Sequence, residues 1–195
     1  MYPINITFEH KKLFPKELGV STGEMGTSMF WAKDSPIFDA TLLKFQNTLA
    51  KNNFVGHIDI NCIVNGIYPL EFTSRFGFPQ IFIQRAGINE PIGDMFLKIA
   101  SGENFKINVK KGFQVGAFIV VPPFPYDDKK TFNLFSKDAV VVFKKNGKEG
   151  VHPMHLKKIY DEWLITGNNG IAVLVTGFGN TMKDAQKMMY KRIIM

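Results

Sequence analysis

Cysteine is nearly absent from this chain of 195 residues, which contains only Cys62. A single cysteine excludes an internal disulfide framework and any zinc site built from several cysteines. Long apolar runs are missing as well: the longest uncharged one, Val115–Val121, is far shorter than the roughly 20 residues that cross a membrane. Residues 1–12 lack the apolar stretch of a secretory signal. These absences predict a cytoplasmic protein that does not interact with a membrane.

Arginine is scarce, since only Arg75, Arg85 and Arg192 are arginines among the 24 basic residues. The lysines are scattered or come in short pairs, so no concentrated basic patch is available for nucleic acid, and we expect no such partner. The net charge of +7 is typical of a solvated lysine surface, and it also suits an anionic small substrate such as a nucleotide. With 45% hydrophobic and 21% charged residues, the composition is that of a folded globular chain.

Helices are predicted where apolar residues recur every three or four positions. One covers 36–51 and begins after Ser35, a favourable N-cap residue. A second covers 91–100 and is followed by Gly102, which suits the position after a helix end. A third begins at a capping box that starts with Thr181 and continues to about residue 193.

Strands are predicted where apolar and polar residues alternate, or where short apolar runs end at turn residues. They cover residues 56–64, 68–75, 113–121, 139–143 and 171–176. Residues 1–34 are rich in glycine and predict irregular structure, whereas the polar segment 103–112 marks the expected boundary between two domains. Because helices and strands mix without a regular alternation, the predicted class is α+β with a largely antiparallel sheet.

The strands on either side of residues 65–67 predict a hairpin whose register follows from the hydrophobic pattern. A two-residue loop would put polar side chains on the apolar face, because a slip by one residue inverts every side chain. A three-residue loop instead pairs Ile60 with Phe72 and Cys62 with Leu70. We therefore expect these four residues on a buried apolar face.

The opposite face of this hairpin is predicted to carry His57, Asp59, Asn61, Glu71, Thr73 and Arg75. Two neighbouring carboxylates repel each other unless a divalent cation lies between them, and Mg²⁺ prefers carboxylate oxygens and substrate phosphates. Arg75 beside such a site could hold a phosphate oxygen. The alternative is an ordinary solvated sheet face with cross-strand polar pairs, and the pattern alone leaves both interpretations open.

Several motifs, in order along nearly the whole chain, resemble the phosphoribosylamine–glycine ligase family, also called glycinamide ribonucleotide synthetases. TGEMG at 22–26 resembles the TGGMG loop of that family, and EHK at 9–11 is similar to the Asp-His-Lys segment before it. PLEFTSRFGFP at 69–79 resembles the E-F-N-x-R-F-G-D-P element. Residues 166–193 are similar to the small C-terminal domain of the family.

The resemblance implies a partial ATP-grasp domain over 1–108, followed over 109–195 by a small α/β C-terminal domain of the glycinamide ribonucleotide synthetase type. Enzymes of this family use ATP to phosphorylate glycine, and phosphoribosylamine then attacks the acyl phosphate, in purine biosynthesis. The implied cofactor is Mg²⁺ or Mn²⁺, with ATP as a substrate. By the same resemblance, Asp59, Glu71 and Thr73 are the metal ligands.

Other matched positions imply roles in binding and catalysis. Arg75 matches an arginine that contacts phosphate and serves catalysis, and Lys11 is a second implied contact to ATP. Gly23, Met25 and Gly26 match the loop that lines the active site.

This sequence departs from the family pattern in three places. Thr73 replaces a metal-binding asparagine, Phe78 replaces an aspartate, and Glu24 replaces a glycine. The motifs also cover only the later part of a complete family member. We therefore expect the C-terminal portion of a ligase that is inactive alone and needs an N-terminal half-enzyme chain or self-association. The alternative is a non-catalytic nucleotide- or partner-binding subunit, or a divergent paralogue, that completes another chain.

The partner surface is expected at the apolar residues among the first 34, namely Phe8, Leu13, Phe14, Phe30 and Trp31.

A few remaining residues have side chains that could take part in chemistry. His57 could assist a phosphate or a metal, but a surface hydrogen bond is the simpler interpretation. His152 and His155 have the spacing of a metal pair, yet no partner cluster follows them in the sequence. Residues 177–180, GFGN, do not complete a dinucleotide motif and predict a turn before the last helix. Phe76 and Phe78 are either core residues or walls of a substrate pocket.

Overall fold

The computed structural model describes residues 4–63, 65–143 and 149–194, which form two compact units. The first unit joins the described residues up to Ile6 to Phe30–Lys111, and the second joins Thr7–Met29 to the residues from Gly112 onward. The predicted domain ranges, 1–108 and 109–195, differ from this grouping because Thr7–Met29 belongs with the later residues. Those ranges stay a prediction.

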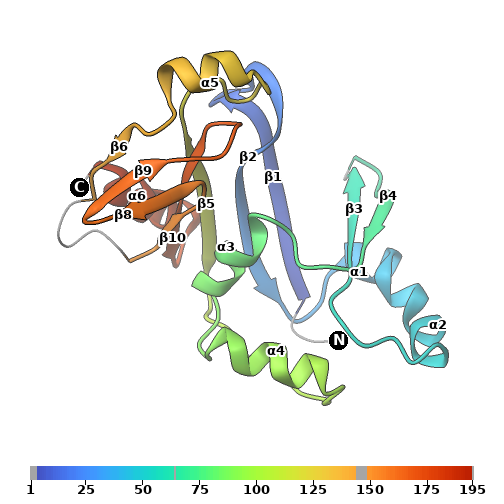
Figure 1. Ribbon diagram of the computed structural model, residues 1–195. Helices are drawn as coiled ribbons and strands as arrows, with labels where there is room; N and C mark the ends of the chain where they lie inside the picture. Colours follow the sequence, from blue (N-terminus) through green and yellow to red (C-terminus); the bar gives the residue numbers. More distant parts are fainter. Residues whose placement is uncertain (1–3, 64, 144–148, 195) are drawn as a thin grey trace. The chain divides into compact units, whose positions relative to one another are not determined.

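The first unit contains short helices and one two-stranded sheet (Figure 1). Its elements are α1 (Pro36–Ala40), the 3₁₀ helix η1 (Leu42–Phe45), α2 (Gln46–Lys51), β3 (Asp59–Ile63), β4 (Tyr68–Thr73), α3 (Gln80–Ala86) and α4 (Ile92–Ala100). Strands β3 and β4 are antiparallel and form the predicted hairpin.

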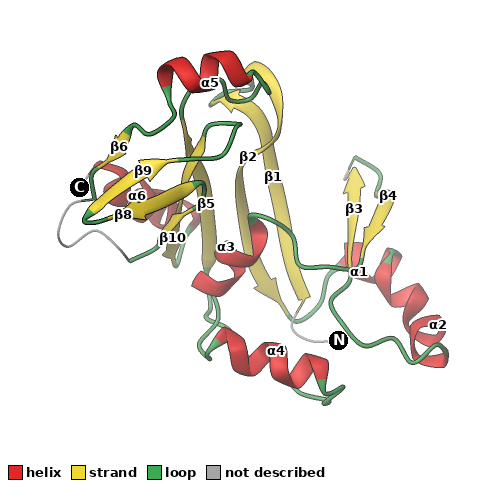
Figure 2. Ribbon diagram, in the orientation of Figure 1, coloured by secondary structure: helices red, strands yellow, loops and turns green. Residues whose placement is uncertain are grey.

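The second unit is built on a five-stranded sheet in the order β1-β2-β5-β10-β7 and a three-stranded sheet in the order β6-β9-β8. The strands of the larger sheet are β1 (Ile4–Phe14), β2 (Leu18–Ala32), β5 (Phe113–Val120), β10 (Ile171–Gly179) and β7 (Val151–Pro153). The remaining elements are α5 (Lys129–Phe135), β6 (Val140–Val141), β8 (Leu156–Ile159), β9 (Glu162–Ile165) and α6 (Met182–Ile194) (Figure 2). The first residues of β1 and the last residues of β2 belong to the first unit.

The strand pairings of β10 with β5 and β7, and of β9 with β6 and β8, are antiparallel. The predicted α+β class with a largely antiparallel sheet is therefore confirmed. No helix in the described part of the chain is long and apolar enough to cross a bilayer.

The prediction of irregular structure over 1–34 is wrong, because most of this segment forms the long strands β1 and β2. Its glycines do not all interrupt a strand. A Cβ placed on Gly26 would lie 3.0 Å from the carbonyl oxygen of Gly116, so a glycine at this point lets β2 approach β5 closely. The glycine-rich pattern reflects packing between neighbouring strands as well as turns.

The single helix predicted over 36–51 is divided into α1, η1 and α2. Ser35 caps α1 as expected, since its hydroxyl accepts the backbone N–H of Phe38 at 3.4 Å. The break falls at Thr41, whose backbone angles are not helical and whose hydroxyl donates to the carbonyl of Ile37. Threonine hydroxyls that bond back to the preceding turn favour bends of this kind.

The other predicted helices and strands agree with the structure to different extents. Strand β5, helix α4 and helix α6 lie where they were expected, whereas the strand predicted over 139–143 is reduced to β6. Residue 64, the end of another predicted strand, lies outside the described residues. Helices α3 and α5 and strands β7, β8 and β9 were not predicted.

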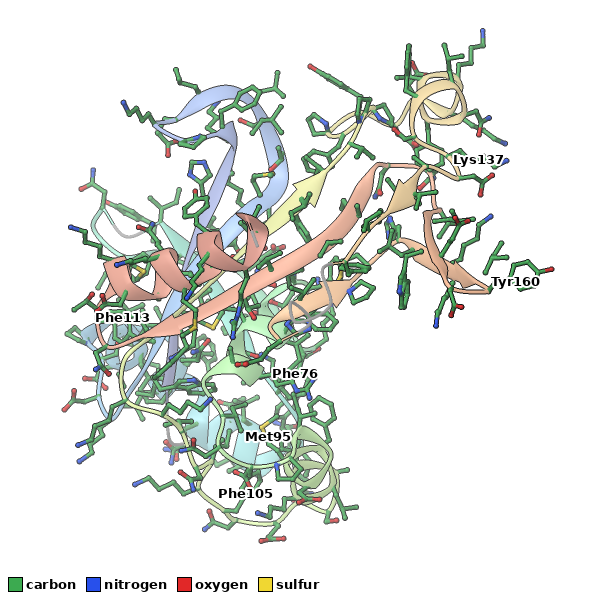
Figure 3. All side chains as sticks on the ribbon, turned by 90° about the vertical axis from the view of Figure 1, so that its left-hand side faces the viewer. Phe76, Met95, Phe105, Phe113, Lys137 and Tyr160 are labelled. Carbon is green, nitrogen blue, oxygen red and sulfur yellow. The ribbon has the colours of Figure 1, made fainter. Side chains whose placement is uncertain are left out.

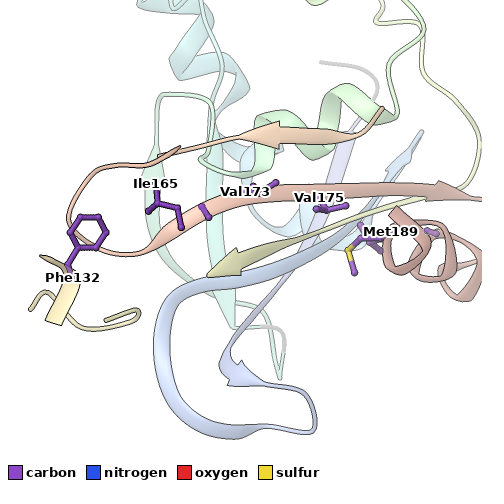
Figure 4. Close-up of a cluster of buried hydrophobic side chains, with 8 residues drawn as sticks. Phe132, Ile165, Val173, Val175 and Met189 are labelled. Carbon is purple, nitrogen blue, oxygen red and sulfur yellow. The ribbon is translucent and has the colours of Figure 1, made fainter. Parts of the chain in front are cut away.

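The core of the second unit lies between the larger sheet and the elements packed on it (Figure 4). It consists of buried apolar side chains from β5, β9, β10, α5 and α6: Val115, Phe132, Ile165, Ala172, Val173, Val175, Ala185 and Met189. Antiparallel pairing places β10 against β5 along most of its length. All eight core residues belong to the second unit, whereas the hairpin that carries the predicted metal ligands belongs to the first.

Helix α6 lies directly on the backbone of β10. A Cβ on Gly177 would lie 2.2 Å from the carbonyl oxygen of Ala185, and one on Gly179 would lie 2.5 Å from the Ala185 nitrogen. The turn predicted over 177–180 is therefore wrong for Gly177 and Gly179, which lie in β10 and make room for the helix.

The first unit has its own buried apolar residues, Phe38, Ile83, Ile88 and Met95. The segment after α4 folds back on the α3–α4 connection, because Ile88 and Val109 form an antiparallel bridge. Figure 3 marks Met95 and Phe105 in this unit. Lys98 of α4 lies 5.3 Å from the centre of the Phe105 ring.

Candidate functional site

The β3–β4 hairpin brings the predicted carboxylates to one face. Asp59 lies opposite Thr73 and Asn61 lies opposite Glu71. Because side chains alternate between the two faces of a strand, Asp59, Asn61, Glu71 and Thr73 share a face. Diagonal neighbours on one face lie about 7–8 Å apart. Asp59 and Glu71 are therefore close enough for their side chains to approach a common ligand.

Each carboxylate receives a hydrogen bond from the residue opposite. The Thr73 hydroxyl donates to Oδ1 of Asp59. The Asn61 amide donates to Oε1 of Glu71 at 3.1 Å. These are the cross-strand polar pairs of the alternative interpretation. They also leave acceptor positions on both carboxylates, since a carboxylate has about four lone-pair sites.

Asp59 has a further partner in His57, whose Nε2 lies 3.3 Å from Oδ2. Burial acts to raise the pKa of Asp59, but hydrogen bonds from His57 and Thr73 and the positive charge of Arg75 outweigh it. The pKa of Asp59 therefore lies below its ordinary value of 3.8. The carboxylate is ionised at neutral pH, as an oxygen ligand of a cation must be.

Aromatic rings fix His57 from its other side. The imidazole stacks on the Phe76 ring, with 4.4 Å between centroids and 24° between planes. Phe76, which is labelled in Figure 3, has its ring centroid 5.0 Å from that of Phe96 of α4. Phe76 therefore supports the polar face, whereas Phe78 is exposed and contacts Phe82 edge-on at 6.2 Å.

The predicted apolar face is only partly correct. Ile60 pairs with Phe72 as expected, and Phe72 packs edge-on against Phe45 at 4.8 Å. Yet Phe72 is 46% exposed, so the prediction that it is buried is wrong. A two-stranded sheet has too few strands to bury the side chains of a face by itself, and the contact with Phe45 of η1 leaves Phe72 partly open.

The register also changes at the far end of the hairpin. Cys62 pairs with Pro69 instead of Leu70, because a bulge in the pairing follows Asn61. The bulge shifts the apolar residues of β4 and leaves Leu70 exposed. Burial raises the pKa of the Cys62 thiol. The residue is half-buried, so the expectation that it lies on a buried face is only partly met.

Arg75 follows β4 on the exposed surface. Its guanidinium donates to the carbonyl of Phe76 at 3.3 Å. Its charge also contributes to the lowered pKa of Asp59. An exposed guanidinium beside an ionised carboxylate is a suitable partner for a phosphate oxygen.

The remaining predicted site residues lie in the second unit, on β1 and β2. Lys11 donates to the carbonyl of Gly23 at 2.9 Å and forms an ion pair with Glu9. Gly23, Met25 and Gly26 lie within β2, so this motif is a strand and not a loop. A Cβ at Gly23 would have no heavy atom within 4 Å, which leaves the backbone open at that point. Glu24 accepts a hydrogen bond from the Thr27 hydroxyl.

The donor set of the hairpin suits a hard divalent cation, because it consists of two carboxylates, an amide and a hydroxyl on one face. Among residues 4–63, 65–143 and 149–194, no three or more His, Cys, Asp or Glu side chains gather as a metal cluster. His152 contacts the Thr176 hydroxyl at 3.3 Å. His155 packs against Gly167, and neither histidine is part of such a cluster.

Comparisons with known proteins agree with the motifs. No protein-family model matches the chain. In sequence it is similar to the phosphoribosylamine–glycine ligase of Lactococcus lactis subsp. lactis (strain IL1403), with 21% identity over 205 residues, covering 99% of this chain and 47% of the ligase. The chain thus spans about half the length of the curated relative that it matches.

The fold is also similar to that of solved enzymes. The crystal structure of phosphoribosylamine–glycine ligase from Thermotoga maritima matches with a TM-score of 0.71 and 17% identity, over 96% of this chain and 47% of that one. The biotin carboxylase subunit of pyruvate carboxylase matches with a TM-score of 0.54 and 14% identity, over 88% and 38%. The α+β fold of this chain is therefore similar to ATP-grasp enzymes, as the motifs predicted.

Proposed function

We propose that this chain is part of an ATP-dependent carbon–nitrogen ligase that resembles phosphoribosylamine–glycine ligase. In such a reaction, ATP phosphorylates the carboxylate of glycine and phosphoribosylamine displaces the phosphate, as a step of purine biosynthesis. Similarity to a ligase of this kind over 99% of the chain supports the proposal.

The observation that carries the proposal at the level of residues is the shared face of Asp59 and Glu71. Together with the Thr73 hydroxyl, these carboxylates would hold Mg²⁺ or Mn²⁺, and Arg75 would bind a phosphate oxygen of ATP. The bound cation would supply neutralisation of phosphate charge. The carboxylates would bind and orient it, since both are held by hydrogen bonds from the opposite strand.

The residues on β1 and β2 are proposed as a second group of contacts. Lys11 would contact ATP, and Gly23, Met25 and Gly26 would line the substrate site. The open backbone at Gly23 supports this role, because a ligand can approach it without meeting a side chain.

We also propose that turnover needs another chain that supplies the rest of the ligase, or self-association. This proposal is supported by the coverage of the relatives, of which the chain spans 47%. The hairpin supports it too, because a two-stranded sheet with exposed Leu70 and Phe72 leaves apolar surface for a partner.

The proposed metal site is tested by titrating the whole chain with Mn²⁺, followed by electron paramagnetic resonance, with and without ATP. Glu71→Gln keeps the size of the side chain and removes one ligand charge. We expect it to weaken Mn²⁺ binding at least about tenfold, as loss of a charged oxygen ligand does. The matched control is Glu103→Gln, which removes the same charge from an exposed position after α4. Equal Mn²⁺ affinity in both variants would assign Glu71 a structural role.

A second candidate function is a non-catalytic nucleotide- or partner-binding subunit. Thr73 favours it, because its hydroxyl already donates to Asp59 and stands where the resembling family has an asparagine. Co-expression with an N-terminal half-enzyme separates the two functions. Binding of Mg²⁺ and ATP without ligase turnover in that assembly supports the non-catalytic role.

A further inference from the structure

We propose that His57 is a positioning residue of the cation site: it holds the Asp59 carboxylate in the orientation that receives a divalent cation. The inference rests on the proposed function, because it concerns the same hairpin. It adds a residue that does not itself bind the cation.

The hydrogen bonds of Asp59 leave its outer acceptor positions available. His57 Nε2 approaches Oδ2 at 3.3 Å, and the Thr73 hydroxyl donates to Oδ1. One donor therefore engages each oxygen, so the carboxylate cannot rotate without breaking a hydrogen bond. Since an ionised carboxylate only accepts hydrogen bonds, Nε2 is the nitrogen that carries the proton in this contact.

The ring of His57 is itself held in place by aromatic packing. It stacks on Phe76, and Phe76 packs on Phe96 of α4. The His57 side chain is 21% exposed, compared with 39% for that of Asp59. The imidazole thus lies on the covered side of the carboxylate, and the more open side of Asp59 remains for a ligand.

The support of Glu71 by the described residues is weaker. Its hydrogen bond comes from Asn61, and both residues are exposed. Of the two carboxylates, Asp59 is therefore the one whose orientation is set before a cation binds. A residue that orients a ligand in this way commonly changes metal affinity by about 10–100-fold.

Two substitutions separate the hydrogen bond of His57 from its stacking. His57→Phe keeps an aromatic ring against Phe76 and removes the donor, whereas His57→Gln restores an N–H donor without the ring. We expect His57→Phe to weaken Mn²⁺ binding by the whole chain about tenfold, and His57→Gln to remain within about threefold of the wild type. Thermal unfolding of each variant reports any loss of fold.

Asp59→Asn is the reference variant that distinguishes the possible failures. If Asp59→Asn loses Mn²⁺ and His57→Phe does not, the positioning role is overturned and the cation site stands. If the wild type shows no saturable binding, or if Asp59→Asn binds as the wild type does, the cation site itself is overturned.

A further pair of variants applies if His57→Phe does not fold cooperatively. His57→Gln and His57→Leu both lack the ring, and only the first has a donor. Tighter Mn²⁺ binding by His57→Gln supports the positioning role, and equal affinities overturn it.

Discussion

Asp128 illustrates how a single polar side chain supports local structure in the second unit. Its Oδ1 accepts the backbone N–H groups of Lys130 at 2.9 Å and Thr131 at 3.2 Å, and its Oδ2 accepts the Thr131 hydroxyl at 2.6 Å. The hydrogen bonds from Thr131 and Lys130 hold the pKa of Asp128 below its ordinary value of 3.8. Asp128 is thus the N-cap of α5, and its ionised form is the better cap.

We expect Asp128→Ala to lower the free energy of unfolding at neutral pH, and Asp128→Asn to lower it less, because asparagine also caps helices. The folded-state pKa is the lower one, so the contribution of the charge is complete above the unfolded pKa. It is lost as the pH falls through the folded pKa. Urea unfolding at neutral pH and at about pH 3 measures this difference. A gap between wild type and alanine that does not narrow in acid would contradict the assignment.

At the scale of elements, the contact between β10 and α6 depends on glycines in the strand. The backbone of α6 lies so close to Gly177 that a side chain there would meet the Ala185 carbonyl at 2.2 Å and the Met189 nitrogen at 2.7 Å. Both atoms belong to the helix backbone and cannot turn away. The close packing therefore requires glycine for reasons of space, independently of backbone angles.

We expect Gly177→Ala to destabilise the protein by about 1–3 kcal/mol, because α6 must shift to admit the methyl group. Gly93→Ala is the control: a Cβ there meets nothing within 4 Å, and the residue lies in α4. That change should stabilise by about 0.5–1 kcal/mol, since alanine has the higher helix propensity. Denaturant unfolding of both variants checks the signs. If Gly177→Ala is neutral or stabilising, β10 and α6 must lie farther apart than the contacts at Gly177 indicate.

At the scale of the whole molecule, exposed apolar side chains gather on the strands β1 and β2. Phe14 and Leu18 are 56% and 59% exposed, and Phe8 is also exposed. Leu13, Phe30 and Trp31 were predicted for the same surface, but they are half-buried and not exposed. Exposed apolar surface of this kind is typical of an interface with another chain.

We expect the isolated chain to self-associate in light scattering and to show no turnover with ATP, Mg²⁺, glycine and phosphoribosylamine. The reason is that it spans 47% of the ligases it resembles and exposes apolar side chains on β1 and β2. The double variant Phe14→Gln, Leu18→Gln should self-associate less than the wild type and should still show no ligase turnover. Turnover by a monodisperse monomer of 22.1 kDa would instead mean that these residues contain a whole active site.

Much of the local structure could be predicted because its determinants lie close together in the sequence. Ser35 and Thr181 accept hydrogen bonds from backbone N–H groups three residues later, as helix caps do. The alternation of polar and apolar residues in β3 and β4 specified the pairing of Asp59 with Thr73 and of Asn61 with Glu71. The carboxylate face therefore followed from the sequence alone, together with the resemblance to a ligase family.

Only the tertiary structure decided the features that depend on residues far apart in the sequence. Gly26 lies within β2 at a point where β5 passes close to its backbone, and the sequence pattern does not distinguish such a glycine from one in a turn. Phe72 stays exposed because few elements cover the hairpin, although its place in the alternation predicted burial. The support of Asp59 by His57 likewise depends on Phe76 and on Phe96 of α4. Local patterns determine which face a side chain occupies, whereas burial and orientation depend on what the fold places against that face.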